Sequence, residues 1–302
     1  MRAVQFSEYG GPDVLRVADV EEPHAAAGQI RIAVKGAGVN PVDWKIRSGL
    51  MQRAMPLELP SIPGSDVAGV VDEVGDGVTD VAVGDEVFGF AVGGGAAQEA
   101  VLEHYATKPA DVSWAEAAAL PVAVETAVRT LDLLGVESGR TLLVNGAAGG
   151  VGIAAVQFAG ARGARVIGTA SESNHEFLRT LGAEPTTYGD GLVDRVRELA
   201  PDGVDRALDT AGRGALPELI EITGSPDHVV TIADFSAVEH GERVTPGAGK
   251  RSWEALGQAA QLHQAGKLTM PVAQTFSFEQ APEAHRISQD GHVRGKLVLI
   301  PG

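Results

Sequence analysis

A glycine-rich turn between a buried strand and a helix constrains the fold of this chain more than any other feature. The apolar run Thr141–Asn145 leads into the turn, and the small-residue run Ile153–Phe158 leaves it; the turn consists of Gly146, Ala147, Ala148, Gly149, Gly150, Val151 and Gly152. Without a side chain, Gly149 lets the backbone approach a pyrophosphate, and Gly152 lets the helix lie close to the strand. We therefore expect the first turn of a βαβ unit, with a role in dinucleotide binding. A tight turn without a ligand is the alternative, whereas a Walker loop is excluded because no Gly-Lys-Ser/Thr follows the glycines.

Strands and helices alternate on both sides of this turn. A capping box, Ser113 followed by Glu116, predicts where the alternation begins. After the first βα pair, expected as strand 141–145 and helix 151–161, we expect strands at 165–169, 204–209 and 228–233, and helices at 174–181, 192–199, 215–222 and 252–265. This order is typical of a parallel sheet covered on both faces. The sequence thus predicts a Rossmann, doubly wound domain over residues 113–272.

The N-terminal third of the chain has a different pattern. Residues 1–112 are rich in Gly, Val and Pro, and turn signals break them into short β-branched runs at 30–34, 67–74 and 86–90. This spacing predicts a β-barrel or sandwich with little helix. The apolar run Lys296–Ile300 is a strand that could rejoin this first domain, so we assign residues 273–302 to it as well.

Composition excludes several classes of function. The chain has 302 residues and no cysteine, which leaves no disulfide, no thiolate nucleophile and no cysteine-ligated metal. Its net charge of −16 argues against nucleic acids and anionic membranes as partners. No apolar run approaches the length of a membrane span, and the first residues lack a signal-peptide pattern, so we expect a cytoplasmic protein.

The strand after the glycine-rich turn bears on the choice of cofactor. It ends at Thr169, and Ser171 stands where an NAD enzyme usually carries an Asp or Glu that accepts from the ribose hydroxyls. A small neutral residue removes repulsion against a 2′-phosphate, which favours NADPH. Glu172 next to it, and the lack of Lys or Arg before Phe177, leave NADH open.

With these residues in view, the chain resembles the medium-chain dehydrogenase/reductase superfamily, and within it the zinc-independent quinone oxidoreductase branch. The motifs that carry the resemblance span nearly the whole chain: Asn40-Pro-Val-Asp43 within 37–49, Pro63-Gly64 within 63–71, Gly84-Asp85 within 83–89, Leu120-Pro121, the glycine-rich turn, and Gly295-Lys296 within 291–299. The resemblance implies a GroES-like β-barrel domain beside a Rossmann domain, with the active site between them. It also implies a homodimer that pairs through the edge strand of the Rossmann domain.

The same resemblance bears on metal chemistry. Zinc-dependent relatives carry a Cys where this chain has Asn40, a His where it has Ser65, and a four-cysteine lobe after the segment 83–88, which here runs on without an insertion. We therefore expect no metal, and alcohol oxidation is disfavoured because no Lewis acid would lower the pKa of the alcohol. What remains is hydride transfer from NADPH to a quinone or an α,β-unsaturated carbonyl.

On the acceptor side, the resemblance assigns Asn40 as a catalytic donor to the acceptor oxygen; an Asx cap of the following turn is the alternative. Lys45 is a second catalytic candidate, although a solvated surface lysine is the commoner outcome. Trp44 and Ser65 are expected to line the pocket, together with loops near 50–60, 90–97 and 234–250. We expect Asp66 to be an ion-pair partner, and Arg47 to pair with Asp43.

On the cofactor side, the glycine-rich turn is joined by residues at the strand ends and in the tail motif. Arg294 and Lys296 could instead form a surface salt bridge, and Tyr188 could be a packed residue at a strand end. Besides Thr169 and Ser171, placed by their position after the glycine-rich turn, the resemblance assigns cofactor contacts to Thr126, Tyr188, Asp209, Ile232, Ala233, Arg294 and Lys296.

Two other functions stay open at this point. A pathway-specific enoyl reductase would depend on a Lys or Tyr proton donor, so Lys45→Ala would impair it with enones far more than with quinones. A non-catalytic NADPH-binding protein would bind the cofactor and turn over no acceptor.

Overall fold

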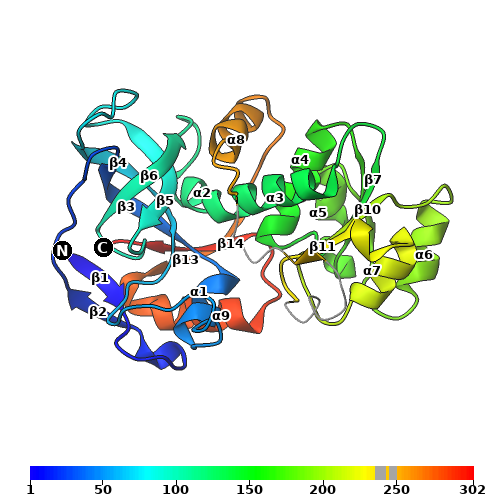
Figure 1. Cartoon of the computed structure of the whole chain (residues 1–302), viewed down its shortest axis with the longest axis horizontal. Helices are drawn as coiled ribbons and strands as arrows, with labels where there is room; N and C mark the ends of the chain where they lie inside the picture. Colours follow the sequence, from blue (N-terminus) through cyan, green and yellow to red (C-terminus); the bar gives the residue numbers. More distant parts are fainter. Residues whose placement is uncertain (235–242, 245–249) are drawn as a thin grey trace. The chain divides into compact units, whose positions relative to one another are not determined.

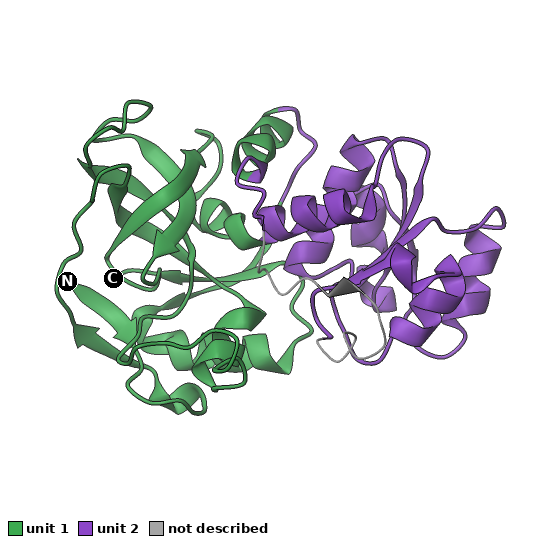
Figure 2. Cartoon of the chain, viewed as in Figure 1, with its two compact units in different colours: residues 1–122, 256–264, 270–302 green, residues 123–255, 265–269 purple. Residues whose placement is uncertain are grey.

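The computed structural model describes residues 1–234, 243–244 and 250–302, the pair 243–244 by its backbone alone (Figure 1). Most of the expected pocket loop 234–250 therefore lies outside the described residues. Contacts divide the chain into two compact units (Figure 2): unit 1 comprises residues 1–122, 256–264 and 270–302, and unit 2 comprises residues 123–255 and 265–269.

A closed sheet forms the centre of unit 1. Its strand order is β13-β14-β3-β4-β5-β6, and β3 also pairs with β6, so the strands β3 to β6 close on themselves. Their inward side chains, such as Ile30, Ile32 and Leu102, are wholly buried. The bounds are β3 (Ile30–Val39), β4 (Asp66–Val74), β5 (Glu86–Val92), β6 (Glu99–Thr107), β13 (Val272–Ser277) and β14 (Lys296–Ile300), with a hairpin of β1 (Arg2–Gln5) and β2 (Arg16–Asp19) beside them. The predicted barrel is confirmed.

The last strand occupies the position expected from its apolar sequence. β14 pairs antiparallel with β3, Leu297 opposite Val39, and parallel with β13 on its other side. Residues 296–300 thus pair with a strand of the barrel. This pairing also brings Lys296 to the end of β3, next to Asn40.

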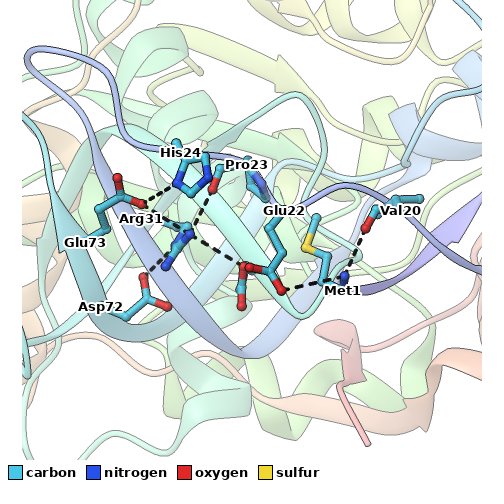
Figure 3. Close-up of polar contacts among 9 residues, drawn as sticks. Met1, Val20, Glu22, Pro23, His24, Arg31, Asp72 and Glu73 are labelled. Atoms are coloured by element: carbon cyan, nitrogen blue, oxygen red, sulfur yellow. Dashed lines mark hydrogen bonds and ion pairs between the residues drawn. The ribbon is translucent and has the colours of Figure 1, made fainter.

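Charged side chains on neighbouring strands support the barrel's register (Figure 3). Arg31 of β3 donates from Nε to Asp72 of β4 at 2.9 Å, and its guanidinium lies 3.2 Å from Glu73, the residue opposite it in the ladder. Arg31 also donates to the carbonyl of Pro23 at 3.1 Å. Cross-strand pairs of opposite charge stabilise a sheet, and here they also tie the segment before β3 to the barrel.

Helices on unit 1 are more numerous than the sequence indicates. The segment after Asn40, expected as a turn, forms helix α1 (Pro41–Arg47), because Pro41 fits the first helical position and the Asn40 N–H donates to Asp43 at 2.8 Å. α9 (Ala281–Asp290) packs against α1 and follows the 3₁₀ turn η5 (Phe278–Gln280). Another 3₁₀ turn, η1 (Pro12–Val14), also contacts α9.

The expected capping box is present. In α2 (Trp114–Ala118), the Glu116 N–H donates to Ser113 Oγ at 3.3 Å and the Ser113 N–H donates to the Glu116 carboxylate at 3.0 Å. α2 contacts β3 and β4, so it lies in unit 1, past the expected boundary at residue 112. α3 (Pro121–Leu134) follows, and all but its first two residues lie in unit 2.

Unit 2 holds a wholly parallel sheet in the order β12-β11-β10-β7-β8-β9. This is the order of a doubly wound fold, in which the chain reverses its direction of growth between β7 and β10. The predicted Rossmann architecture is confirmed, with shorter strands at two positions than expected, β10 and β11. The strands are β7 (Thr141–Asn145), β8 (Arg165–Thr169), β9 (Glu184–Thr186), β10 (Arg206–Asp209), β11 (Val229–Thr231) and β12 (Arg243–Val244).

Helices between these strands bury a shared apolar core. Leu143 and Ile167 of the sheet pack with Val196 and Leu219 of the helices. The helices are α4 (Gly150–Ala161), α5 (His175–Thr180) after a short 3₁₀ turn η2 (Glu172–Asn174), α6 (Leu192–Leu199) and α7 (Leu216–Thr223), with η3 (Pro226–His228) before β11; α8 (Ala255–Gln264) follows later and lies mostly in unit 1. Among the described residues, no helix is both long and apolar enough to cross a membrane.

Candidate active site

Three buried polar side chains meet in unit 1 where β3, β4 and β14 lie side by side. The Asn40 amide donates from Nδ2 to Asp66 Oδ2 at 2.9 Å, and the Lys296 ammonium donates to Asn40 Oδ1 and, at 3.2 Å, to Asp66 Oδ2. All three residues are 5% exposed or less. The expectation that Asp66 is an ion-pair partner is confirmed. The structure also brings together Asn40 and Lys296, which the resemblance assigned to different ligands.

Asp66 holds this cluster in place. Its Oδ2 receives both Asn40 and Lys296, while its Oδ1 accepts the N–H of Val122 at 2.8 Å. One amide N–H of Asn40 is therefore engaged. The orientation of the amide group is fixed, because Oδ1 faces the Lys296 ammonium and Nδ2 faces the Asp66 carboxylate. The second Nδ2 hydrogen has no acceptor among the described residues.

Asp43 is a second buried carboxyl close to this cluster. Its pKa is raised to about 7: burial and the neighbouring Asp66 raise the pKa, whereas the Asn40 N–H and the Lys296 ammonium lower it. The predicted ion pair between Asp43 and Arg47 is wrong. Asp43 instead accepts the N–H of Asn40, and the Arg47 side chain donates to Gln289. Residues four apart share a helix face, yet Asp43 turns to the N–H that precedes α1 and Arg47 turns to Gln289 of α9.

The remaining acceptor-side candidates lie around the start of α1. Trp44 and Lys45 are both half-buried, and the Lys45 ammonium lies 5.9 Å from the Trp44 ring centroid. Burial lowers the pKa of Lys45. Ser65 directly precedes Asp66, and its carbonyl accepts the N–H of Ala91 at 2.8 Å. The structure places none of these three side chains in the hydrogen-bonded cluster of Asn40.

The glycine-rich turn of unit 2 has the geometry that its sequence predicts. Gly146 has a φ of 81°, which favours glycine. At Gly152, an added Cβ would lie 2.3 Å from the carbonyl oxygen of Gly146, so a side chain here would force the helix away from the turn. At Gly149, an added Cβ would meet only that same carbonyl oxygen, at 3.5 Å. The turn is therefore packed tightly at Gly152 and is open at Gly149, the N-cap residue of α4.

The rest of the turn is held by the neighbouring strand. The N–H of Ala147 donates to the carbonyl of Thr169 at 2.9 Å, and Gly146 donates to the Thr169 hydroxyl at 3.1 Å. Ala148, Gly150 and Val151 complete the turn and the first residues of α4. The first N–H groups of such a helix have no partner within it, so they are free to bind an anion at the switch point of the sheet.

Polar side chains join the carboxyl ends of four strands beneath this turn. Asn145 of β7 accepts from the Thr169 hydroxyl of β8 at 2.7 Å and donates to Asp209 of β10 at 2.8 Å; Thr231 of β11 also donates to Asp209, at 2.8 Å. Asp209 further accepts the N–H groups of Ala211 and Gly212. These hydrogen bonds hold Asp209 and the strand ends together. Sequence reasoning omitted Asn145, although a polar residue ending an apolar strand could have indicated it.

Two predicted cofactor residues lie near the ends of β8 and β9. The Ser171 hydroxyl accepts from Asn174 at 3.0 Å and lies 3.1 Å from that of Ser173, a cluster of neutral donors. Tyr188 is 55% exposed on the turn after β9. Arg195 of α6, which sequence reasoning missed, holds that turn: it donates to the carbonyls of Thr187, Gly189 and Asp190 at 2.7 to 3.0 Å. No sequence signal distinguishes it from any other arginine on a polar helix face.

Thr126 of α3 lies next to a buried carboxylate. Glu125 is wholly buried, and it accepts from Arg129 at 2.8 Å, from Arg251 at 3.0 Å and from the N–H of Ser252 at 3.2 Å. The Thr126 hydroxyl lies 3.5 Å from the same carboxylate. Glu125 thus ties α3 to the segment before α8.

The last predicted cofactor residues differ in their surroundings. The N–H of Ile232 donates to the carbonyl of Asp209, and that of Ala233 to the Thr231 hydroxyl. The N–H groups of Ile232 and Ala233 are therefore used within the chain. Arg294 is exposed in unit 1, two residues before the buried Lys296.

The side chains at the zinc positions of relatives do not suit a metal. In residues 1–234 and 250–302, His, Asp and Glu side chains form no group of three that could hold a metal ion. At the positions of the zinc ligands in relatives, the chain carries the amide of Asn40 and the hydroxyl of Ser65. Thiolate and imidazole are the ligands that zinc prefers in proteins, so these side chains do not fit a zinc site.

Comparison with known proteins gives matches over the whole chain. The family described as alcohol dehydrogenase GroES-like domain matches residues 26–123, and the family described as zinc-binding dehydrogenase matches residues 181–299. A 2-methylene-furan-3-one reductase of Solanum lycopersicum is 34% identical, over 100% of this chain and 79% of that protein. A quinone oxidoreductase of Rattus norvegicus is 33% identical, over 99% of this chain and 98% of that protein. A solved structure of a mycobacterial protein complexed with NADPH is 28% identical with a TM-score of 0.83, and the match covers 100% of both chains.

Proposed function

The chain belongs to the quinone oxidoreductase-like branch of the medium-chain dehydrogenase/reductase superfamily, and we propose that it uses NADPH to reduce a quinone or an α,β-unsaturated carbonyl. The observation that carries this proposal is the buried cluster of Asn40, Asp66 and Lys296. Hydride addition to either acceptor places negative charge on its oxygen. Preorganised donors in a buried site stabilise such charge strongly, and this cluster supplies two of them.

Each residue of the cluster has a distinct role in the proposal. The Lys296 ammonium and the second Nδ2 hydrogen of Asn40 donate to the acceptor oxygen as its charge develops. Asp66 is a positioning residue, because it receives both groups and is itself fixed by the Val122 N–H. The reduced acceptor then takes its proton from the Lys296 ammonium, which regains one from solvent.

The glycine-rich turn is proposed to hold the pyrophosphate of NADPH, which supplies the hydride when bound. The open space over Gly149 and the free N–H groups at the start of α4 fit a pyrophosphate. The neutral hydroxyls around Ser171 and the exposed Tyr188 fit the ribose 2′-phosphate because they bring no negative charge to it. Thr126, Ile232, Ala233 and Arg294 are proposed contacts along the rest of the cofactor.

The test is the decay of NADPH absorbance with benzoquinone and with a simple enone. We expect turnover with at least one of them, and Lys296→Met or Asn40→Ala to lower kcat/KM about 100-fold or more, the usual cost of losing an oxyanion donor. Lys35→Met is the matched control, because Lys35 is exposed on the same barrel. Tight NADPH binding without turnover of any acceptor would instead identify a non-catalytic binding protein. Equal affinities for NADPH and NADH would contradict the role of Ser171.

An enoyl reductase is a second candidate because Lys45 is half-buried and its pKa is lowered by burial. A lysine of lowered pKa gives up a proton more readily to an enolate. Lys45→Ala would then reduce turnover of enones strongly and turnover of quinones little. Equal losses with both acceptors would exclude this candidate.

We further propose that the protein is a cytoplasmic homodimer. β12 is the terminal strand in the described order of the unit 2 sheet, so its outer edge could pair with a second copy. Light scattering of the purified protein tests the dimer, with a monomer mass as the contrary result. Cell fractionation tests the compartment.

A further inference from the structure

A buried arginine in unit 1 lacks a counter-charge. Arg47, the last residue of α1, is 0% exposed, and its one side-chain hydrogen bond within the described part of the chain runs from a terminal nitrogen to Gln289 at 3.3 Å. Its Nε and its other terminal nitrogen have no partner among the described residues. A guanidinium stays charged at every physiological pH, and buried charges are almost always paired. Arg47 therefore needs a negative charge that the described protein does not supply.

A histidine on the neighbouring helix points to the same place. His285 of α9 is 1% exposed, and its Nδ1 also has no partner among the described residues. Burial, and the charge of Arg47, lower the pKa of His285 to about 3, so its ring is neutral. A neutral imidazole can turn its one N–H toward an anion without adding a second buried positive charge. α1 and α9 thus present unpartnered donors to each other where they pack.

The carboxylates on the surrounding elements are engaged elsewhere. Asp43 of α1 accepts the N–H of Asn40, and Glu283 of α9 pairs with Arg286. Asp13 of η1 attracts Arg47, yet its side chain is 88% exposed and its ion pair is with Arg286 at 3.7 Å. Within the described residues, no carboxylate lies within 4.0 Å of the Arg47 guanidinium.

We propose that α1 and α9 enclose a halide site, chloride in the cell, that is held by Arg47 and His285. A monatomic anion matches the site because both side chains are shut off from solvent, and each group that binds it is a donor. Chloride supplies the missing charge, which a water molecule cannot do. The site is distinct from the cluster of Asn40 and Lys296 and does not depend on the proposed reductase activity.

The direct test is a crystal structure of the full chain grown in sodium bromide, measured at the bromine absorption edge. We expect an anomalous peak within hydrogen-bond distance of the free Arg47 nitrogens. Density without an anomalous peak, as from a water molecule, would overturn the proposal.

Solution stability gives a second test. Unfolding by urea is followed in sodium chloride and in sodium gluconate at equal ionic strength. Above the dissociation constant, a tenfold rise in chloride should lower the unfolding equilibrium constant about tenfold, because the anion binds only the folded state. Arg47→Met should abolish this dependence, while Arg53→Met, at an exposed arginine of unit 1, should keep it. A chloride dependence of equal size in all three proteins would contradict the site, and the bromide structure decides the matter if Arg47→Met does not fold.

Discussion

The buried carboxyl of Asp43 should make the protein less stable as the pH rises, and Asp43→Asn should remove this effect. Burial raises the pKa of Asp43 from 3.8 to about 7. A carboxyl whose pKa is raised on folding contributes stability fully below its unfolded pKa, near 4, and this contribution is lost as the pH rises through 7. A shift of about 3 units at about 1.4 kcal/mol per unit corresponds to about 4 kcal/mol. That figure is an upper bound, because relaxation around the charge reduces it.

Asparagine has nearly the shape of aspartate and keeps an oxygen that can accept the Asn40 N–H, so it retains the local hydrogen bond. Asp43→Asn should therefore match the parent protein near pH 4 and exceed its free energy of unfolding by about 2 to 4 kcal/mol at pH 8. Urea unfolding at several pH values between 4 and 8 measures this difference. Asp76→Asn, at an exposed aspartate of unit 1, is the control and should show no such trend. A difference between Asp43→Asn and its parent that does not grow with pH would refute the reasoning.

Three further substitutions test unit 2. Gly152→Ala would place a Cβ 2.3 Å from the Gly146 carbonyl oxygen, so we expect the free energy of unfolding to fall by about 1 to 3 kcal/mol and NADPH to bind more weakly. An unchanged NADPH affinity in a fluorescence titration would contradict a role of the turn in cofactor binding. Arg195→Met should free the turn that carries Tyr188 and raise KM for NADPH severalfold at constant kcat, and a fall in kcat alone would argue against this. Glu125→Ala leaves Arg129 and Arg251 without their carboxylate and should lower the free energy of unfolding by about 3 to 5 kcal/mol, measured by urea unfolding. A loss below about 1 kcal/mol would show that the two arginines find other partners.

Local sequence patterns predicted most of the elements. Apolar runs bounded by turn residues located β7, β8 and β14 to the residue, and the capping box located the start of α2. Helix α1 was expected as a turn because its seven residues are too few for a periodic pattern to emerge. Its helical form depends on Pro41 and on the Asp43 carboxylate, which caps the first turn.

The sequence indicated which residues form the candidate site better than it indicated which of them contact one another. The resemblance indicated Asn40 and Lys296, but the two stand far apart in sequence and only the pairing of β14 with β3 brings them together. Asp43 and Arg47, by contrast, lie only four residues apart on one helix, and yet their side chains do not pair. Partnership between charged residues depends on which tertiary neighbours bury each one, and one sequence does not contain that information.

The return of β14 to the barrel has a consequence for synthesis on the ribosome. β14 lies between β13 and β3, yet it emerges only after all of unit 2 has left the exit tunnel. The edge of β3 and the apolar residues that β14 covers, Val39 among them, therefore await their partner while the Rossmann sheet is already able to form. A nascent chain stalled before residue 296 would carry a folded unit 2 and an open, aggregation-prone barrel. Because unit 1 contains both the first and the last residues of this sequence, it finishes folding after unit 2.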